Sequence, residues 1–213
     1  MLVLTTRPPL GRPVGGSGEQ TRRRIVAATM RTVAEVGYSR ATIREIARTA
    51  QITSGSLYHY FPNKSELVKA TFDELADIAV PRLAAAADEA TGVVDKLMAL
   101  FDEGGRVVRE YPYAVAFDRA IRVESAEHLH LGEDADTLFD TLRAVVVDIV
   151  EQARRDGDLD PDADVGGAAN AIFAILRGMY DQAAVASTAH YDATLDAVKR
   201  LIQGTLFGSG RPA

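Results

Sequence analysis

The chain has 213 residues, of which 47 % are hydrophobic and 25 % charged, values typical of a globular protein with a buried core. It contains no cysteine, which excludes disulfides and thiolate metal sites. The apolar residues 1–6 are too few for a signal peptide or a membrane span, and Arg7 and Pro8 interrupt them. We therefore expect an intracellular chain without membrane association.

The net charge of −6 is distributed unevenly. Residues 1–64 contain ten Lys or Arg and three acidic residues, a net charge of +7, whereas the remainder carries −13. A basic N-terminal quarter on an acidic body predicts that the first part binds a polyanion. A solvated arm with a chance excess of basic residues is the alternative.

The N-terminal region begins with an irregular segment and continues as helix. Residues 1–18 are rich in Pro and Gly without periodicity, which predicts a flexible arm. Apolar residues at helical spacing predict a first helix over 19–36, and Gly37 provides its stop. Thr42 and Glu45 form a capping box that opens a short second helix.

Two further helices follow at once. Thr53 or Ser54 can cap a third helix that runs through Tyr60. A fourth helix is predicted over 63–80, where Pro81 should break or kink it.

The rest of the chain also has helical periodicity, and no run alternates apolar and polar residues as a half-buried strand does. Further helices are expected over 93–109, 112–126, from Asp134 or Asp136 to Asp156, over 164–186 with Asp164 as cap, and over 192–207 with Asp192 as cap. The sequence therefore predicts an all-α chain of about nine helices.

Two short helices joined by a tight turn and preceded by a supporting helix make a helix-turn-helix. The second of them contains SGSLYHYF, residues 54–61. Its small first residues let the helix N-terminus approach base edges, with free N–H groups facing the DNA backbone. Leu57 and Phe61, four residues apart, share the buried face, and the Tyr-His-Tyr run between them is long enough to reach phosphates.

Residues 21–70 resemble the DNA-binding domain of TetR-type transcriptional regulators. The matching features are a Gly-aromatic end to the first helix, a Thr opening the second, an Ile-Ala pair, and a small-residue turn before Leu-Tyr-aromatic-aromatic-Phe-x-x-Lys. In this chain they are Gly37-Tyr38, Thr42, Ile46-Ala47 and the segment Leu57 to Lys64. The family usually has glycine where this chain has Gln51, and a left-handed conformation there would cost about 1 kcal/mol.

The resemblance implies a set of DNA contacts in the two short helices and at the start of the fourth. They are Thr42, Arg44, Thr53, Ser54, Gly55, Ser56, Tyr58, His59, Tyr60 and Lys64. Arg44 is the main candidate for base readout, because Ser and Gly are poor donors of base specificity. Lys64 is expected to contact phosphate, and Arg22, Arg23 and Arg24 to lie near the DNA.

The resemblance also implies a division into an arm (1–18), a helix-turn-helix DNA-binding domain (19–64), a helical ligand-binding and dimerisation domain (65–207) and a tail (208–213). Apolar stripes with small residues in 164–207 favour a homodimer interface there. An internal core alone is the alternative. A dimer would place two reading helices about 34–36 Å apart, in successive major grooves of a palindrome.

A small-molecule pocket is expected among the central helices. The large apolar candidates for its wall are Phe101, Tyr113, Phe117, Ile121, Phe139 and Phe173. The polar candidates are Arg122, four residues after Asp118, Arg143, four after Phe139, and Arg177, four after Phe173. One of these could bind an acidic or carbonyl-bearing ligand, but a core position or a surface salt bridge is the alternative for each.

Metal and cofactor sites are not expected. His128 and His130 lie among acidic residues, but their loop setting favours chance clustering over a metal site. There is also no phosphate loop, nucleophile elbow, HExxH motif or dinucleotide fingerprint, so we do not expect an enzyme.

The combined expectation is a ligand-responsive regulator, a repressor that binds a palindromic operator on double-stranded DNA as a homodimer and is released by a small molecule. The alternatives are a helical enzyme, an interaction module that does not bind DNA and, among regulators, an activator. The resemblance implies a cytoplasmic, nucleoid-associated protein of bacteria.

Overall fold

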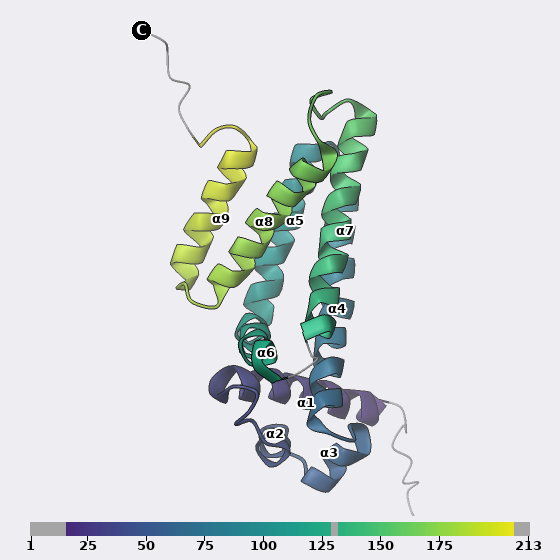
Figure 1. Ribbon diagram of the computed structural model, residues 1–213, viewed down its shortest axis with the longest axis vertical. Coiled ribbons are helices and arrows are strands. Elements are labelled where there is room, and N and C mark those ends of the chain that lie inside the picture. Colours follow the sequence, from purple (N-terminus) through teal and green to yellow (C-terminus); the bar gives the residue numbers. More distant parts are fainter. Residues whose placement is uncertain (1–15, 129–131, 207–213) are drawn as a thin grey trace, which may run out of the picture.

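The computed structural model describes residues 16–128 and 132–206, and these ranges form nine α-helices without a strand (Figure 1). The helices are α1 (Gly16–Val36), α2 (Ile43–Thr49), α3 (Ser54–Tyr60), α4 (Lys64–Asp88), α5 (Val93–Glu110), α6 (Ala114–His128), α7 (Gly132–Asp156), α8 (Val165–Ala183) and α9 (Thr188–Ile202). The all-α prediction is confirmed. Most of the predicted arm, His130 and the predicted tail lie outside the described residues.

The helices form a head and a body joined by α4 (Figure 1). α1, α2 and α3 make the head, and α6 packs against α1. The body consists of α5, α7, α8, α9 and the second half of α4, with α4 packed against both α5 and α7. Within the described ranges, none of the helices combines the length and apolarity that a membrane span requires.

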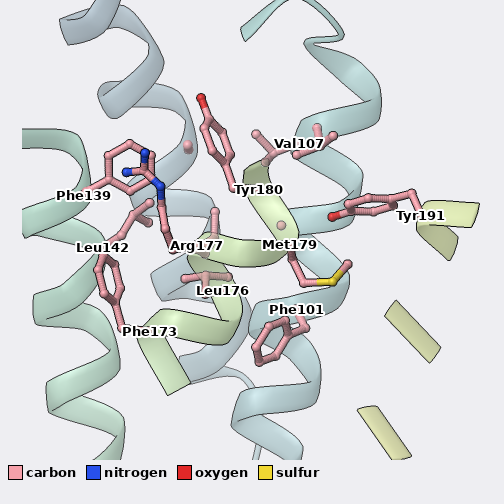
Figure 2. A pocket seen from close by; sticks show the side chains of 14 residues that line it. Phe101, Val107, Phe139, Leu142, Phe173, Leu176, Arg177, Met179, Tyr180 and Tyr191 are labelled. Atoms are coloured by element: carbon pink, nitrogen blue, oxygen red, sulfur yellow. The ribbon is translucent and has the colours of Figure 1, made fainter. Parts of the chain in front are cut away.

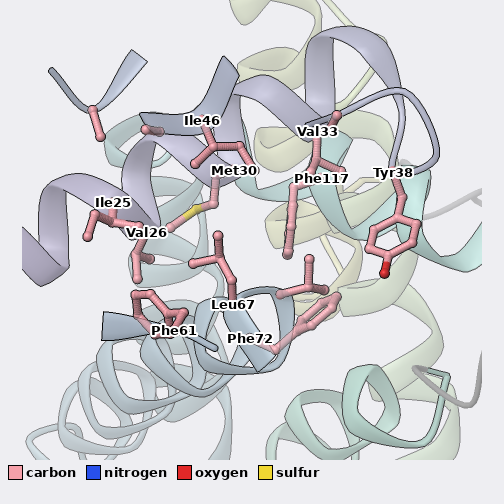
Figure 3. Close-up of a cluster of buried hydrophobic side chains, with 14 of the residues drawn as sticks. Ile25, Val26, Met30, Val33, Tyr38, Ile46, Phe61, Leu67, Phe72 and Phe117 are labelled. Atoms are coloured by element: carbon pink, nitrogen blue, oxygen red, sulfur yellow. The ribbon is translucent and has the colours of Figure 1, made fainter. Parts of the chain in front are cut away.

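The head has its own buried core, to which every one of its helices contributes (Figure 3). Ile25 of α1, Ile46 of α2, Leu57 of α3 and Leu67 of α4 are all fully buried in it. Phe61 is buried as well, so the prediction that Leu57 and Phe61 form the inner face of the third helix is confirmed. Burial on this scale fixes the angle between α2 and α3.

Local hydrogen bonds fix where α2, α3 and α4 begin. Thr42 and Glu45 form the predicted capping box, with each side chain bound to the other's backbone N–H. Thr53 accepts from the N–H of Ser56, and Asn63 caps α4 in the same way. Each cap satisfies an N–H group that the helix itself leaves without a partner.

The fourth helix is longer than predicted. α4 continues through Pro81 to Asp88, so the expectation that it ends near residue 80 was wrong. Pro81 is exposed, and water can satisfy the carbonyl that loses its N–H partner. The four alanines that follow, residues 84–87, have the highest helix propensity and favour continuation.

Other helix starts also differ from the predictions, and α7 begins at Gly132 rather than at Asp134 or Asp136. Pro112 lies in the turn before α6 rather than at its first position. The last helix begins at Thr188 and is capped by Ser187, not by Asp192. Asp192 lies inside α9, where its carboxylate pairs with Arg109 of α5 at 3.0 Å.

The turn between α2 and α3 contains the one non-glycine residue with positive φ in the described ranges, Gln51 at 57°. The N–H of Gln51 donates to the carbonyl of Arg48 at 3.0 Å, and that of Ile52 to the carbonyl of Ala47 at 2.9 Å. This is the Schellman arrangement, which places a left-handed residue directly after a helix. Gln51 therefore adopts the left-handed conformation that is usual for glycine at this position of the family, despite its cost.

Replacing Gln51 by glycine is expected to raise the free energy of unfolding by about 0.5–1 kcal/mol. Glycine carries no Cβ penalty at positive φ, and this gain exceeds its larger loss of backbone entropy on folding. Urea unfolding followed by circular dichroism measures the difference, and Gln51→Val should change stability in the opposite direction. A glycine variant less stable than the wild type would contradict this assignment of strain.

Candidate functional site

The reading helix α3 presents a small, open N-terminus and larger polar side chains further on. Gly55 and Ser56 are exposed, and a Cβ added at Gly55 would meet nothing nearer than the hydroxyl of Thr53 at 3.9 Å. Tyr58 is 53 % exposed, His59 is exposed, and Tyr60 is partly buried with its ring edge-on to His59. The helix can therefore come close to a flat or grooved partner at its start.

A shallow hollow lies between α2 and α3, lined by Arg44, Arg48, Thr53 and Ser54 among others. Arg44 is exposed and makes no hydrogen bond or ion pair within the described part of the chain. Its guanidinium is available for an external acceptor. The Thr42 hydroxyl, by contrast, is engaged with Glu45, and the hydrogen bonds from Thr42 lower the pKa of Glu45.

Lys64 is bound to the head itself. Its Nζ donates to the carbonyls of Tyr38 at 2.7 Å and Ala41 at 2.9 Å, and it lies 4.0 Å from the centre of the Tyr38 ring. Burial lowers the pKa of Lys64, an effect that the nearby Glu124 opposes. Because an ammonium has three donors, one remains for the phosphate contact, which stays a prediction.

The arginines at the start of α1 also make internal contacts. Arg24 donates to the carbonyls of Ala50 at 2.5 Å and Gln51 at 3.3 Å, at the turn between α2 and α3. Arg22 pairs with Glu74 of α4 at 2.6 Å. These contacts hold the helix-turn-helix on its supporting helices.

One contact from α6 reaches the loop between α1 and α2. Glu124 accepts hydrogen bonds from both the backbone N–H and the hydroxyl of Ser39. Burial favours the neutral form of Glu124, but these bonds and the charge of Lys64 outweigh it, and its pKa is lowered. Sequence reasoning did not find this contact, because nothing local links residues 85 positions apart.

A mostly apolar cavity of about 70 Å³ lies in the body (Figure 2). Its walls come from five helices: α4, α5, α7, α8 and α9. Phe101, Phe139, Phe173 and Arg177, all predicted pocket residues, line it. Of the predicted set, these four are brought together.

The other predicted pocket residues lie elsewhere. Phe117 and Ile121 are buried in the core of the head, and Tyr113 lies at a surface groove between α1 and α4. Arg143 is exposed and binds Asn170, whose Oδ1 accepts at 2.8 Å. Arg122 does not line the cavity, although its guanidinium lies 4.9 Å from the centre of the Phe139 ring.

Several cavity residues were not predicted. Tyr180 shares a helix face with Arg177, three residues earlier, and that spacing was the available signal. Tyr191 was expected in a loop, because the start of the last helix was placed at Asp192. The side chain of His128 is not described, so the predicted absence of a metal at His128 and His130 stays a prediction.

A buried carboxylate lies beside the cavity. Asp118 of α6 is 1 % exposed, and both of its oxygens accept from Nε of Arg122, at 2.9 and 3.0 Å. Arg177 of α8 is 3.9 Å from the same carboxylate and only 3.7 Å from the centre of the Phe139 ring. The spacing of four residues between Asp118 and Arg122 thus brings the two side chains together.

Burial has a measurable consequence for Asp118. It raises the pKa of this carboxyl above its ordinary value of 3.8, even though Arg122 and Arg177 favour the charged form. Burial likewise raises the pKa of Tyr180. At pH values between 3.8 and this raised pKa, Asp118 is mostly protonated in the folded protein and mostly ionised in the unfolded chain.

The stability of the wild type relative to Asp118→Asn should therefore fall as the pH rises from about 4 through the raised pKa. Asparagine does not titrate, and the other carboxyls contribute equally to both proteins, so the difference isolates Asp118. Urea unfolding of the two proteins from about pH 4 to 7 gives this difference. A difference that stays constant, or grows in favour of the wild type, would contradict the direction of the shift.

The head and body together define a helix-turn-helix transcriptional regulator with an internal cavity, and comparison with known proteins identifies its family. The model described as "Bacterial regulatory proteins, tetR family" matches residues 25–71. The KstR2 transcriptional repressor of Mycolicibacterium smegmatis is 32 % identical over 142 residues, which are 66 % of this chain and 67 % of that protein. The chain belongs to the TetR family, and the resemblance found in the sequence is confirmed.

Solved structures share the same fold. The fatty acid degradation regulator FadR from Bacillus halodurans superposes with a TM-score of 0.70 at 21 % identity, over 91 % of this chain and 97 % of that one. FadR from Bacillus subtilis, in complex with stearoyl-CoA, gives 0.71 at 19 % identity, over 89 % and 99 %. The relatives are regulators rather than enzymes, in agreement with the expectation that this chain is not an enzyme.

Proposed function

We propose that this protein is a ligand-responsive repressor that binds a palindromic operator as a homodimer and is released by a small molecule. The observation that carries the proposal is the exposed face of α3, with small residues at its start and polar aromatic residues after them. The related KstR2 protein is named a transcriptional repressor, which supports repression rather than activation.

The DNA contacts divide by the reach of the side chains. Thr53, Ser54 and Ser56 approach base edges, Gly55 allows this approach, and Arg44 reads a base edge or phosphate from α2. The contacts to the DNA backbone come from the remaining predicted set, namely Thr42, Tyr58, His59, Tyr60 and the free donor of Lys64.

A dimer through residues 164–207 is supported by the exposed faces of α8 and α9. Ala171, Ala174 and Gly178 are exposed and lie at spacings of three and four on α8, where a second helix could approach closely. Val185, in the turn between α8 and α9, is 69 % exposed, and Leu201 of α9 is 44 % exposed. Burying these apolar groups against a second copy would stabilise the dimer.

The small size of the cavity supports the proposal that a ligand acts by changing the arrangement of the helices. Ligand sites usually measure about 300–1,000 Å³, whereas this cavity measures about 70 Å³, so its walls must separate to admit a ligand. Ala79 and Leu83 of α4 belong to those walls, and α4 begins at Lys64 in the head. A ligand that favours the expanded state would move α4 and change the spacing of the two heads.

The direct test is fluorescence anisotropy with a labelled duplex from the region upstream of the protein's own gene. We expect tight binding at low salt that weakens steeply as salt is added, because phosphate contacts release counterions. The absence of binding at low salt would overturn the proposal. A reporter assay then gives the sign of regulation: expression that falls when the gene is deleted indicates an activator instead.

Substituting Arg44 by alanine should relax the preference among operator variants and cost about 1–3 kcal/mol at one base position. Arg106→Ala is the matched control, because Arg106 is an exposed arginine on α5 that pairs with Glu103, far from the reading helix. Anisotropy against single-base operator variants measures the effect. Unchanged preference with uniformly weaker binding would assign Arg44 to phosphate.

A further inference from the structure

The cavity has apolar walls with a single charged side chain among them. The residues that line it are aliphatic or aromatic apart from glycine, Arg177 and the hydroxyls of Tyr180 and Tyr191 (Figure 2). A molecule that fills this cavity must therefore be mostly apolar, because a polar group without a partner there would lose its hydrogen bonds to water. Only one part of such a molecule can carry charge.

The Arg177 guanidinium is held in place next to the cavity. It lies over the Phe139 ring, and Tyr180 packs edge-on against the same ring at 5.3 Å between centroids. The Arg177 side chain is 27 % exposed, so its charge is partly removed from water. Its Nε donates to Asp181 at 3.4 Å, and stacking over an aromatic ring gives the remaining guanidinium donors a preset orientation for a planar anion.

Arg177 is the more loosely paired of the two guanidinium groups around Asp118. Asp118 is the buried carboxylate of the group, and both of its oxygens are bound closely by Arg122. Arg177 is farther from it, at 3.9 Å, and its other acidic partner, Asp181, is 59 % exposed at 3.4 Å. Arg177 thus has only a long contact to the buried carboxylate and a largely exposed second partner, so its guanidinium can bind an anion that enters the cavity.

We propose that the effector is an apolar carboxylic acid whose carboxylate is bound by Arg177 while its apolar part fills the cavity. The inference rests on the proposed function, since it assigns a chemical class to the ligand of that regulator. The ligand carboxylate would take up the guanidinium donors in the bidentate geometry that this group favours. Asp118 repels the incoming anion and competes with it for Arg177.

The experiment compares straight-chain carboxylates of eight to twelve carbons with the alcohols of equal length, by isothermal titration into the full-length protein. We expect the best carboxylate to bind about tenfold or more tightly than its alcohol, because a carboxylate forms charge-assisted, bidentate hydrogen bonds with a guanidinium and a hydroxyl does not. Arg177→Gln should remove this difference and leave the alcohol unaffected. Arg143→Gln, an exposed arginine outside the cavity, should preserve it.

Asp118→Asn separates ligand recognition from a purely structural role of Arg177. Removing the competing carboxylate should tighten carboxylate binding, by about tenfold, and leave alcohol binding nearly unchanged. Circular dichroism and thermal unfolding establish that each variant is folded. Where Arg177→Gln does not fold, the wild-type comparison of acid with alcohol decides by itself.

Three outcomes would overturn the inference: equal binding of acid and alcohol, an acid preference that survives in folded Arg177→Gln, or no binding of any acid. Tight binding of decanoyl-CoA without binding of decanoate would also overturn it, because recognition would then lie in the nucleotide part. These outcomes leave the proposed function intact as long as the protein binds its operator. Loss of operator binding in the anisotropy assay is the separate result that overturns the proposed function.

Discussion

Replacing Phe117 by alanine is expected to lower the free energy of unfolding by about 3–5 kcal/mol, the range for removing a buried aromatic side chain. Phe117 is fully buried and packs on Phe72 of α4, with 4.9 Å between the ring centroids. Phe117 packs α6 against the core of the head, so the variant should also weaken the hydrogen bonds between Glu124 and Ser39.

Urea unfolding measures this loss, and Phe117→Leu should be less affected because most of the apolar volume is retained. Phe173→Ala is the contrasting variant, since Phe173 is a partly buried wall of the cavity. It should lose less stability but change ligand binding. If Phe117→Ala altered ligand affinity and left stability nearly unchanged, Phe117 would belong to the pocket, as the sequence predicted, and not to the core of the head.

Lys64→Ala should destabilise the head by about 2 kcal/mol as well as weaken DNA binding. Its ammonium supplies donors to the carbonyls of Tyr38 and Ala41, and hydrogen bonds from charged groups contribute about 1.5–3 kcal/mol each before solvent exposure reduces them. Without these two hydrogen bonds, the loop before α2 is held less firmly, and Arg44 lies at the start of α2. Urea unfolding and operator affinity should therefore change together.

The dependence of affinity on salt separates this structural role from a phosphate contact. A lost phosphate contact lowers the slope of log affinity against log salt by about 1, whereas a loosened head weakens binding at the same slope. Lys69→Ala is the control, because Lys69 is an exposed lysine on the same helix. A variant with unchanged stability and a lower slope would show that Lys64 serves the DNA alone.

The elements that were predicted well depend on residues close together in sequence. The capping box of Thr42 with Glu45 and a cap at Thr53 or Ser54 both depend on contacts within three residues, which can be read from the sequence directly. The errors arose where a local signal was outweighed. Pro81 is exposed and followed by alanines, and Asp192, the predicted cap, lies inside α9 and pairs with Arg109 of α5.

The pocket could be predicted only in part, for a physical reason. Helical spacing places Phe173, Arg177 and Tyr180 on one face, but does not say whether that face meets a cavity, a core or water. Phe117 and Phe139 are indistinguishable in sequence, although one fills the core of the head and the other faces the cavity.

The sequence by itself determined the all-α class, the caps of α2 and α3, the helix-turn-helix and the family, because each depends on local hydrogen bonding or on a short pattern of residues. Only the tertiary structure decided that Lys64 binds the carbonyls of Tyr38 and Ala41, that Glu124 holds Ser39, and that Arg177 shares a buried carboxylate. These contacts join side chains from different helices. Their geometry follows from how the two cores pack, and the spacing of residues along the chain does not specify it.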